Sequence, residues 1–273
     1  MKYYLFAKFF QHLTADALME CCEELGIDGP TAMIRDGYWV TRENQKTTLP
    51  SFIKTAQAHH LEVTYADTTI SMSDIESCEE ELRIMKDSGI TQFRVNYISK
   101  SAAGSPRGLQ DYTRALVEKT VQMAQKHNIQ AIIQIHGYLY PHNATAAYSA
   151  VKGLDAKYIG IKIDPGNNIC QEGYELFDYQ IQLLGEYVAA LGAKDGCVKR
   201  IDDVSNDQKG WSRGFAPAFE GISDYPLIFR NLKKINFNGP AILMPFYNEK
   251  NFGKLLENLK KEIKYFKDIE SRT

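Results

Sequence analysis

Residues 131–137 (AIIQIHG) and 158–168 (YIGIKIDPGNN) decide the fold. Both stretches are apolar, β-type runs, and they end on the polar residues Gln134, His136, Lys162 and Asp164. Alternate residues of a strand point to the same side, so the two polar residues of each run share one face. Two neighbouring strands that deliver an amide, an imidazole, an amine and a carboxylate to one end are typical of an active-site mouth.

The same unit, a strand followed by a helix, repeats along the chain of 273 residues. Strand-like runs occupy residues 3–9, 26–40, 62–70, 90–98, 129–137, 158–164, 189–195 and 239–247. Strict alternation of strands and helices implies parallel strands joined by right-handed crossovers. Eight units in one chain predict an α/β fold, a single (β/α)8 TIM barrel domain over residues 1–273. A doubly wound open sheet is the alternative.

Composition restricts the partners. The formal net charge is −2 and the pI is near 6.3, whereas nucleic-acid binding usually leaves a basic footprint. No apolar run is long enough to span a bilayer, and Lys8 interrupts the apolar N-terminal run, which argues against a signal peptide. The five Cys include no C-x-x-C pair, as in reduced cytoplasmic proteins. We therefore expect a cytoplasmic protein that binds neither nucleic acid nor membranes.

The active site of a barrel lies at the C-terminal ends of its strands, and this rule selects the candidate site residues. Polar residues in the strands would face the barrel interior, where a charge is costly unless it is paired or bound to a ligand. We expect the catalytic residues to be Asp164, His136 and Lys194. The expected substrate-binding residues are Arg94, Asn96, Gln134, Lys162, Asn167, Arg35, Glu220 and Trp211.

Several of these residues also have a purely structural interpretation. Asp164 begins the sequence Asp-Pro-Gly-Asn, which is good turn chemistry. His136 could bond to the backbone, and Lys194 could form an exposed pair with the aspartate that follows it. Arg94 is harder to explain in this way, because an inward guanidinium needs an anionic ligand or an acid such as Asp67 or Asp164.

A long polar stretch between residues 196 and 223 follows the seventh strand, and we expect it to form a loop. It contains Trp211, which could form an apolar wall for a sugar ring together with Tyr247; packing in the core is the alternative. The sequence leaves open whether this loop closes as a lid or contacts another subunit, so a homo-oligomer stays an open alternative.

The order and spacing of five short motifs resemble the xylose isomerase-like TIM barrels of sugar phosphate isomerases and epimerases. The motifs are ELGIDGPTAMIR (24–35), IQIHG (133–137), IKIDPGNN (161–168), AKD (193–195) and NGPAILM (238–244). The resemblance implies a divalent metal held by Glu, Asp, His and Glu on strands five to eight. The corresponding positions here are Gln134, Asp164, Gly192 and Met244, so only the aspartate of that set is present.

This substitution changes the expected cofactor. Hard cations are held by oxygen ligands whose charge offsets the dehydration of the ion. One carboxylate with an amide, a glycine and a thioether makes a poor site for Mg²⁺ or Mn²⁺. We expect no tightly bound metal or other cofactor; a weakly bound divalent metal near Asp164 stays an open alternative.

The resemblance implies carbohydrate metabolism: an isomerase or epimerase that removes a proton next to a carbonyl and stabilises the resulting ene-diolate. Metals normally do the second task, and preorganised cations can also do it. Lys194, Lys162 and Arg94 are the candidate cations, and Asp164 or His136 is the candidate base. The cation-rich mouth favours a small carbohydrate with a phosphate or a carboxylate.

Two other functions compete with this hypothesis. A non-catalytic carbohydrate-binding barrel would explain the missing metal ligands, although it leaves the cluster of His136, Asp164 and Lys194 without a purpose. Metal-dependent DNA repair on the same barrel would need several His and acid ligands and a basic face. Neither is visible in a chain with six His and a pI near 6.3.

Overall fold

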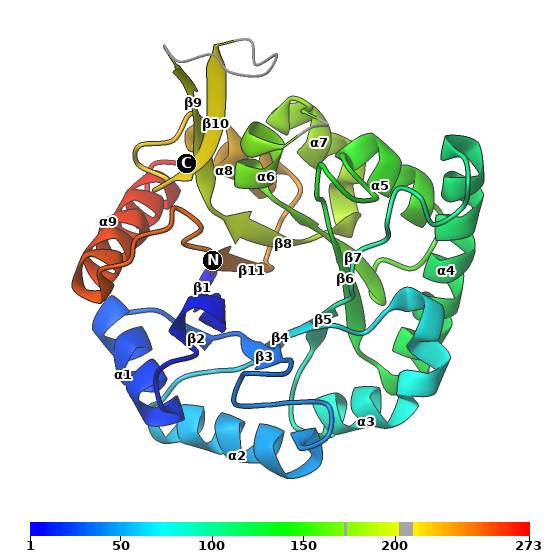
Figure 1. Cartoon of the computed structure of the whole chain (residues 1–273), viewed down its shortest axis with the longest axis horizontal. Helices are drawn as coiled ribbons and strands as arrows, with labels where there is room; N and C mark the ends of the chain where they lie inside the picture. The colour runs from blue at the N-terminus through cyan, green and yellow to red at the C-terminus, as the bar shows by residue number, and fades with distance from the viewer. Residues whose placement is uncertain (172–173, 202–209) are drawn as a thin grey trace.

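The computed structural model describes residues 1–171, 174–201 and 210–273. Among these residues, nine parallel strands form one sheet in the order β2-β1-β11-β8-β7-β6-β5-β4-β3. The strands are β1 (Lys2–Leu5), β2 (Gly29–Pro30), β3 (Ala32–Ile34), β4 (Tyr65–Thr68), β5 (Gln92–Arg94), β6 (Gln130–Gln134), β7 (Ile159–Ile163), β8 (Val188–Ala193) and β11 (Pro240–Leu243). Figure 1 shows them curved into a nearly closed barrel with helices around the outside.

The helices follow the strands in the alternation that the sequence predicts. They are α1 (Ala15–Leu25), α2 (Gln45–Ala58), α3 (Glu79–Asp87), α4 (Pro106–His127), α5 (Ala144–Val151), α6 (Pro165–Cys170), α7 (Phe177–Leu184), α8 (Tyr225–Lys234) and α9 (Phe252–Glu270). The predicted TIM barrel fold is therefore confirmed. None of the helices in the described part of the chain is long and apolar enough to cross a membrane.

The second strand of the barrel is split into two short pieces. β2 pairs with β1, and β3 pairs with β4. Between them, the backbone N–H of Thr31 donates to the carbonyl of Leu5 over 2.8 Å, so the chain passes from one neighbour to the other without leaving the barrel wall. The eight units predicted from the sequence thus correspond to eight positions around the barrel, one of them formed by β2 and β3 together.

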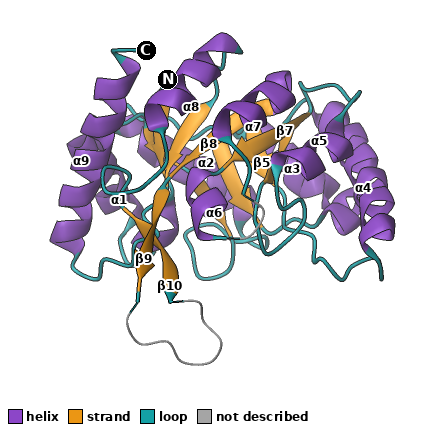
Figure 2. Ribbon diagram, turned by 90° about the horizontal axis from the view of Figure 1, so that it is seen from above, coloured by secondary structure: helices purple, strands orange, loops and turns teal. Residues whose placement is uncertain are grey.

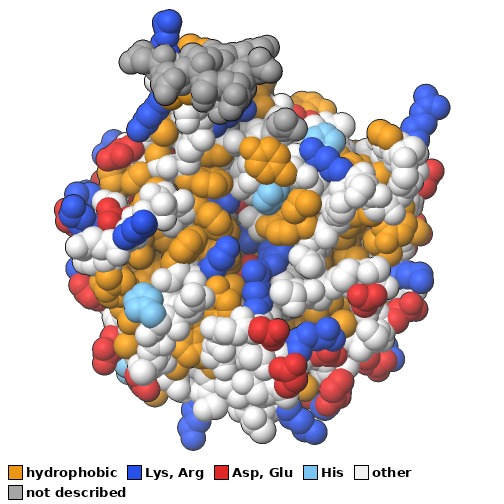
Figure 3. Space-filling view, in the orientation of Figure 1, with side chains coloured by type: hydrophobic (Ala, Val, Ile, Leu, Met, Phe, Trp, Pro, Cys, Tyr) orange, Lys and Arg blue, Asp and Glu red, His pale blue; other side chains and the backbone are white. Residues whose placement is uncertain are grey.

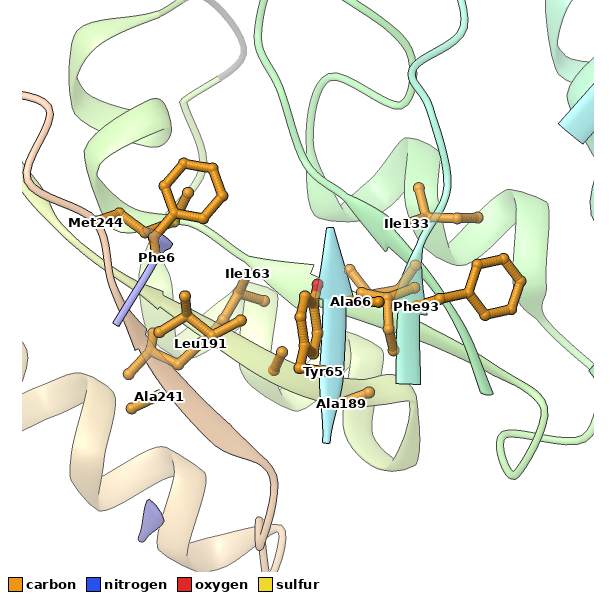
Figure 4. Packing of buried hydrophobic residues seen from close by; sticks show 14 of the residues in the cluster. Phe6, Tyr65, Ala66, Phe93, Ile133, Ile163, Ala189, Leu191, Ala241 and Met244 are labelled. Carbon is orange, nitrogen blue, oxygen red and sulfur yellow. The ribbon is translucent and has the colours of Figure 1, made fainter. Parts of the chain in front are cut away.

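Apolar side chains from all sides of the barrel make one continuous core. Figure 4 shows part of this core. Phe6 and Met244 lie near one another, Phe93 and Ile133 lie on the paired strands β5 and β6, and Tyr65 lies between these two groups. Burial of a large apolar side chain contributes roughly 1.5–3 kcal/mol. A core of this extent can therefore offset the cost of a few buried charges in the barrel interior.

The stretch between residues 196 and 223, which we expected to form a loop, contains an antiparallel hairpin. Its strands are β9 (Asp195–Arg200) and β10 (Trp211–Ala216), and Figure 2 shows the hairpin projecting from the barrel. Residues 202–209 of the expected loop lie outside the described residues. The hairpin begins directly after Lys194, and its second strand brings Phe215 back to the mouth of the barrel.

Glu262 of α9 holds the chain where it returns from the hairpin. This carboxylate is 3% exposed. One of its oxygens accepts from the backbone N–H of Ala218 over 2.9 Å, and the other accepts from the hydroxyl of Tyr247 over 3.0 Å. Burial raises the pKa of Glu262 to about 7. The native state therefore binds a proton on this group more tightly than the unfolded chain does.

We predict that this proton makes stability depend on pH. Because the folded pKa lies above the unfolded value, the contribution is complete below pH 4.5 and is lost as the pH rises through about 7. The loss amounts to about 3 kcal/mol of unfolding free energy. Glu262→Gln has no proton to lose, so the stability of the native sequence relative to this variant should fall over that range. Urea unfolding at a series of pH values measures the difference, and a constant difference would contradict the prediction.

Candidate functional site

A cavity of about 190 Å³ opens at the C-terminal ends of the barrel strands. Six residues selected from the sequence line it: Arg35, Arg94, Gln134, His136, Asn167 and Lys194. The rings of Phe6, Phe215 and Phe246 supply much of the apolar lining. Figure 3 shows Lys and Arg side chains gathered near the centre of this face, with hydrophobic side chains around them.

The other candidate residues lie outside the lining of this cavity. Asp164 and Lys162 are buried and contact residues of the lining. Asn96 and Glu220 are exposed to solvent, and Trp211 is 59% exposed on β10. The hydroxyl of Tyr247, suggested as part of the same wall as Trp211, instead donates to Glu262. The aromatic rings that line the cavity are those of three phenylalanines together with Tyr97 and His136.

Asp164 connects three polar residues of the site. It is the N-cap of α6, and its Oδ1 accepts from the backbone N–H of Asn167 over 2.9 Å. Its Oδ2 accepts from Nε2 of Gln134 over 2.5 Å and lies 3.2 Å from Nζ of Lys194. The turn interpretation of Asp164 is therefore correct, because the residue caps α6, while its role in a site stays a prediction. Both of its oxygens are occupied.

Lys194 is held in an apolar part of the cavity. Its Nζ donates to Oδ1 of Asn167 over 2.8 Å. The same atom lies 4.2 Å from the ring centre of Phe246 and 4.7 Å from that of Phe215. Burial lowers the pKa of Lys194, while Asp164 acts in the opposite direction. An amine in this environment loses its proton more readily than one in water.

Arg94 is paired with Asp67, one of the two acids expected for it. Its Nε lies 3.2 Å from Oδ1 of Asp67. Its two Nη atoms donate to the carbonyls of Val95 and Thr68 over 2.8 and 2.7 Å. Lys162 Nζ is 3.8 Å from the same Asp67 oxygen, too far for a hydrogen bond, and burial lowers the pKa of Lys162 to about 8.

The hydrogen bonds of His136 fix its tautomer. The backbone N–H of Gly137 donates to Oε1 of Gln171 over 2.8 Å, which sets the orientation of that amide. Nε2 of Gln171 therefore donates to Nε2 of His136 over 3.2 Å. The ring proton then lies on Nδ1, which has no hydrogen-bond partner among the described residues. Burial lowers the pKa of His136 and so favours the neutral ring, while Asp164 acts in the opposite direction.

Buried polar atoms that lack a protein partner are concentrated in this part of the barrel. Within the described residues, they include Arg35 Nε and His136 Nδ1 in the lining, and Lys162 Nζ, Asp67 Oδ2 and the hydroxyl of Tyr65 in the interior. A buried polar atom without a partner costs about 1–3 kcal/mol. Ordered water is the usual partner of such atoms in proteins.

The positions that correspond to the metal ligands lie together, but their side chains do not fit a metal. A Cβ atom added to Gly192 would lie 3.1 Å from Oδ2 of Asp164 and 3.3 Å from the sulfur of Met244. The only carboxylate of the set, Asp164, faces N–H donors from Gln134 and Lys194. No group of three or more His, Cys, Asp or Glu in the described ranges is arranged to hold a metal ion.

The chain is a (β/α)8 barrel with a cavity lined by polar and aromatic residues at the C-terminal ends of its strands. The chain belongs to the xylose isomerase-like TIM barrel family, whose sequence model matches residues 19–269. No curated protein matches the chain.

Three solved structures illustrate the similarity of the fold. A D-psicose 3-epimerase with D-tagatose from Clostridium cellulolyticum H10 is 11% identical, with 99% of each chain covered and a TM-score of 0.72. The probable 3-DHS dehydratase AsbF of Bacillus anthracis is 18% identical, with 98% of this chain and 99% of that chain covered and a TM-score of 0.70. A xylose isomerase-like TIM barrel protein from Mycobacterium smegmatis in complex with magnesium is 16% identical, with 98% and 97% covered and a TM-score of 0.69. At these identities the likeness shows the fold alone.

Sequence reasoning missed Tyr97, Gln171 and Phe215 as residues of the cavity. β5 ends at Arg94, and the alternation of faces stops there, so Tyr97 lines the cavity and Asn96 does not. Gln171 follows the short helix α6, and no residue pattern points to it. Phe215 lies in the hairpin that the sequence did not predict.

We predict that divalent metals do not stabilise the protein. A ligand that binds the native state raises its stability according to its concentration and affinity. The donor groups of Gln134 and Lys194 that face Asp164 leave it without room for a cation. Thermal unfolding in Mn²⁺, in Mg²⁺ and in EDTA should give the same midpoint. A midpoint that rises with Mn²⁺ in the native sequence, and no longer rises in Asp164→Asn, would contradict the prediction.

Proposed function

We propose that the protein is an isomerase or epimerase of a small carbohydrate, and that it moves a proton next to a carbonyl without a metal at the usual position. The observation that carries this proposal is the presence of a desolvated lysine, Lys194, and a neutral histidine, His136, in one cavity. The cavity, at about 190 Å³, is smaller than pockets for drug-sized ligands, which favours a small substrate.

Lys194 has the role of the base in this proposal. In the fraction of molecules in which Nζ has lost its proton, it takes the proton from the carbon next to the carbonyl and becomes an ammonium group beside the ene-diolate. Asp164 and Asn167 hold Nζ in position and stabilise the ammonium once it forms. We expected Asp164 or His136 to be the base. Asp164 is less suited to this role because both of its oxygens are engaged and it lies outside the cavity lining.

His136 has the role of a neutral hydrogen-bond donor. Its Nδ1–H stabilises the negative charge that develops on the carbonyl oxygen, and Gln171 keeps the ring in the required tautomer. Return of the proton from the Lys194 ammonium to the neighbouring carbon, with transfer of the hydroxyl proton from one oxygen to the other, completes an isomerisation. An epimerisation would in addition require a proton donor on the opposite face of the carbon. The rings of Phe215 and Phe246 exclude water from Lys194 during these steps.

We predict that Lys194→Met lowers turnover by at least about 10²-fold, the smaller end of what a positioned acid or base contributes. The assay is deuterium incorporation from D₂O next to the carbonyl, followed by NMR over a panel of aldoses, ketoses and their acidic derivatives. The double variant Lys194→Met/Asp164→Asn removes both buried charges, so neither is left without its partner. It controls for loss of folding in the single variant and should be equally inactive. Lys157→Met changes an exposed lysine and should retain full activity.

Two results would count against this function. Unchanged deuterium incorporation in a folded Lys194→Met variant would remove the proposed base. Carbohydrates that bind the native protein without any incorporation would favour the alternative, a barrel that binds carbohydrate and does not convert it.

The pH profile gives a separate prediction. Lys194 must be uncharged to accept a proton, so turnover should fall as the pH decreases through its pKa. Burial lowers that pKa, and the acidic limb should therefore lie below the ordinary lysine value of 10.5. His136→Asn should lower the plateau without moving this limb. An acidic limb that disappears in His136→Asn would instead assign the titrating base to the histidine.

A further inference from the structure

Two cations of the cavity differ from the others in having no acid beside them. Arg94 has Asp67 at 3.2 Å, and Lys194 has Asp164 at the same distance. Lys8 and Arg35 also line the cavity. No carboxylate of residues 1–171, 174–201 and 210–273 lies within ion-pair distance of either one.

Aromatic rings surround the amine of Lys8, and a buried donor of Arg35 lacks a hydrogen-bond partner among the described residues. Nζ of Lys8 lies 5.4 Å from the ring centre of Phe246 and 5.9 Å from that of Phe9. Nε of Arg35 is buried and has no hydrogen-bond partner within the described part of the chain. A guanidinium offers five N–H donors, and an unused buried donor is unfavourable until a ligand accepts from it.

The backbone around both residues is fixed. The N–H of Arg35 donates to the carbonyl of Val40 over 2.9 Å, and the N–H of Tyr38 donates to the carbonyl of Arg35 over 3.2 Å. The hydroxyl of Tyr38 donates to the carbonyl of Lys8 over 3.3 Å, which joins the segment after β3 to the segment after β1. The two cations are therefore held on neighbouring segments of the barrel mouth.

Electrostatics makes this arrangement unfavourable without a ligand. Burial lowers the pKa of Lys8, and the charges of Arg35 and Arg94 lower it further. Burial and Arg94 also lower the pKa of Arg35, and Asp67, which forms no ion pair with it, acts in the opposite direction. An anion between Lys8 and Arg35 would replace repulsion with two charge-assisted contacts, which are among the strongest hydrogen bonds in proteins.

We propose that Lys8 and Arg35 form an anion subsite, and that the substrate carries a carboxylate or phosphate group which binds there. This assignment of the substrate class rests on the proposed function, because it places the anionic group in the same small cavity as Lys194 and His136. Lys8 and Arg35 follow β1 and β3, whereas His136 and Lys194 follow β6 and β8. One molecule can thus be held by its anionic group and present its carbonyl to the lysine and the histidine.

The test is isothermal titration of the full chain with inorganic phosphate and, separately, with glycolate as a small hydroxy acid. The variants are Lys8→Met and Arg35→Met, and Lys54→Met is the control because it removes an exposed lysine of α2. Each cavity variant should weaken anion binding on the order of tenfold or more. The control should bind as the native sequence does. Tighter binding of phosphate supports a phosphorylated substrate, and tighter binding of glycolate supports a sugar acid.

A second measurement shows that the variants act through charge and not through loss of folding. Removing one of two cations that repel each other should leave the midpoint of thermal unfolding unchanged or raise it. Phosphate should raise the midpoint of the native sequence more than that of Arg35→Met. The subsite would be overturned if Lys8→Met and Arg35→Met bound anions as tightly as the Lys54→Met control does. It would also be overturned if neither anion bound to the native sequence.

Failure of the subsite and failure of the proposed function give different results. Arg35-dependent anion binding without deuterium incorporation in any carbohydrate supports the subsite and contradicts the isomerase or epimerase. Incorporation into neutral sugars that neither phosphate nor glycolate inhibits contradicts the subsite and supports the proposed function.

Discussion

The mouth of the barrel depends on two buried carboxylates that hold two buried cations. Asp67 pairs with Arg94, and Asp164 pairs with Lys194. Each ion is costly to remove from water, and loss of one partner from such a pair costs roughly 3–5 kcal/mol. The acids are consequently structural partners of the cations, and neither of them lines the cavity. The groups left to meet a ligand are mainly N–H donors, which suits a ligand with oxygen atoms and negative charge.

The pair of Asp164 and Lys194 lies where the family resemblance implies a metal site. Gly192 stands where the resemblance implies a histidine ligand, and Asp164 and Met244 pack so close to it that a Cβ atom there would lie 3.1 Å from Oδ2 and 3.3 Å from the sulfur. Lys194, two residues further along the chain, brings its Nζ to Asp164 instead. A lysine is part of the chain, so it needs no set of protein ligands to hold it, whereas a metal ion does. It also gains or loses a proton, which a metal ion cannot do, and it can therefore combine charge stabilisation with proton transfer.

The sequence predicted the barrel and about half of the candidate site because both depend on local alternation. Gln134 and Lys162 follow the period of two within strands that are hydrogen-bonded in register, so their inward position could be read from the residues. The alternation fails where the strand ends, as at Asn96, and it says nothing about the hairpin that carries Trp211 away from the cavity. Contacts such as that of Gln171 with His136 arise only when segments distant in the sequence meet.

The net charge of the chain does not show which charges are paired inside the cavity. The whole chain carries a formal charge of −2, yet its cavity contains two cations, Lys8 and Arg35, that form no ion pair with a described acid. Burial beside the aromatic rings lowers the pKa of Lys194 and that of Lys8 for the same physical reason, the loss of water around the amine. An environment that weakens the hold of Lys194 on its proton also strengthens the attraction of Lys8 for an anion. A substrate with a negative group at one end and a carbonyl at the other would use both effects at once.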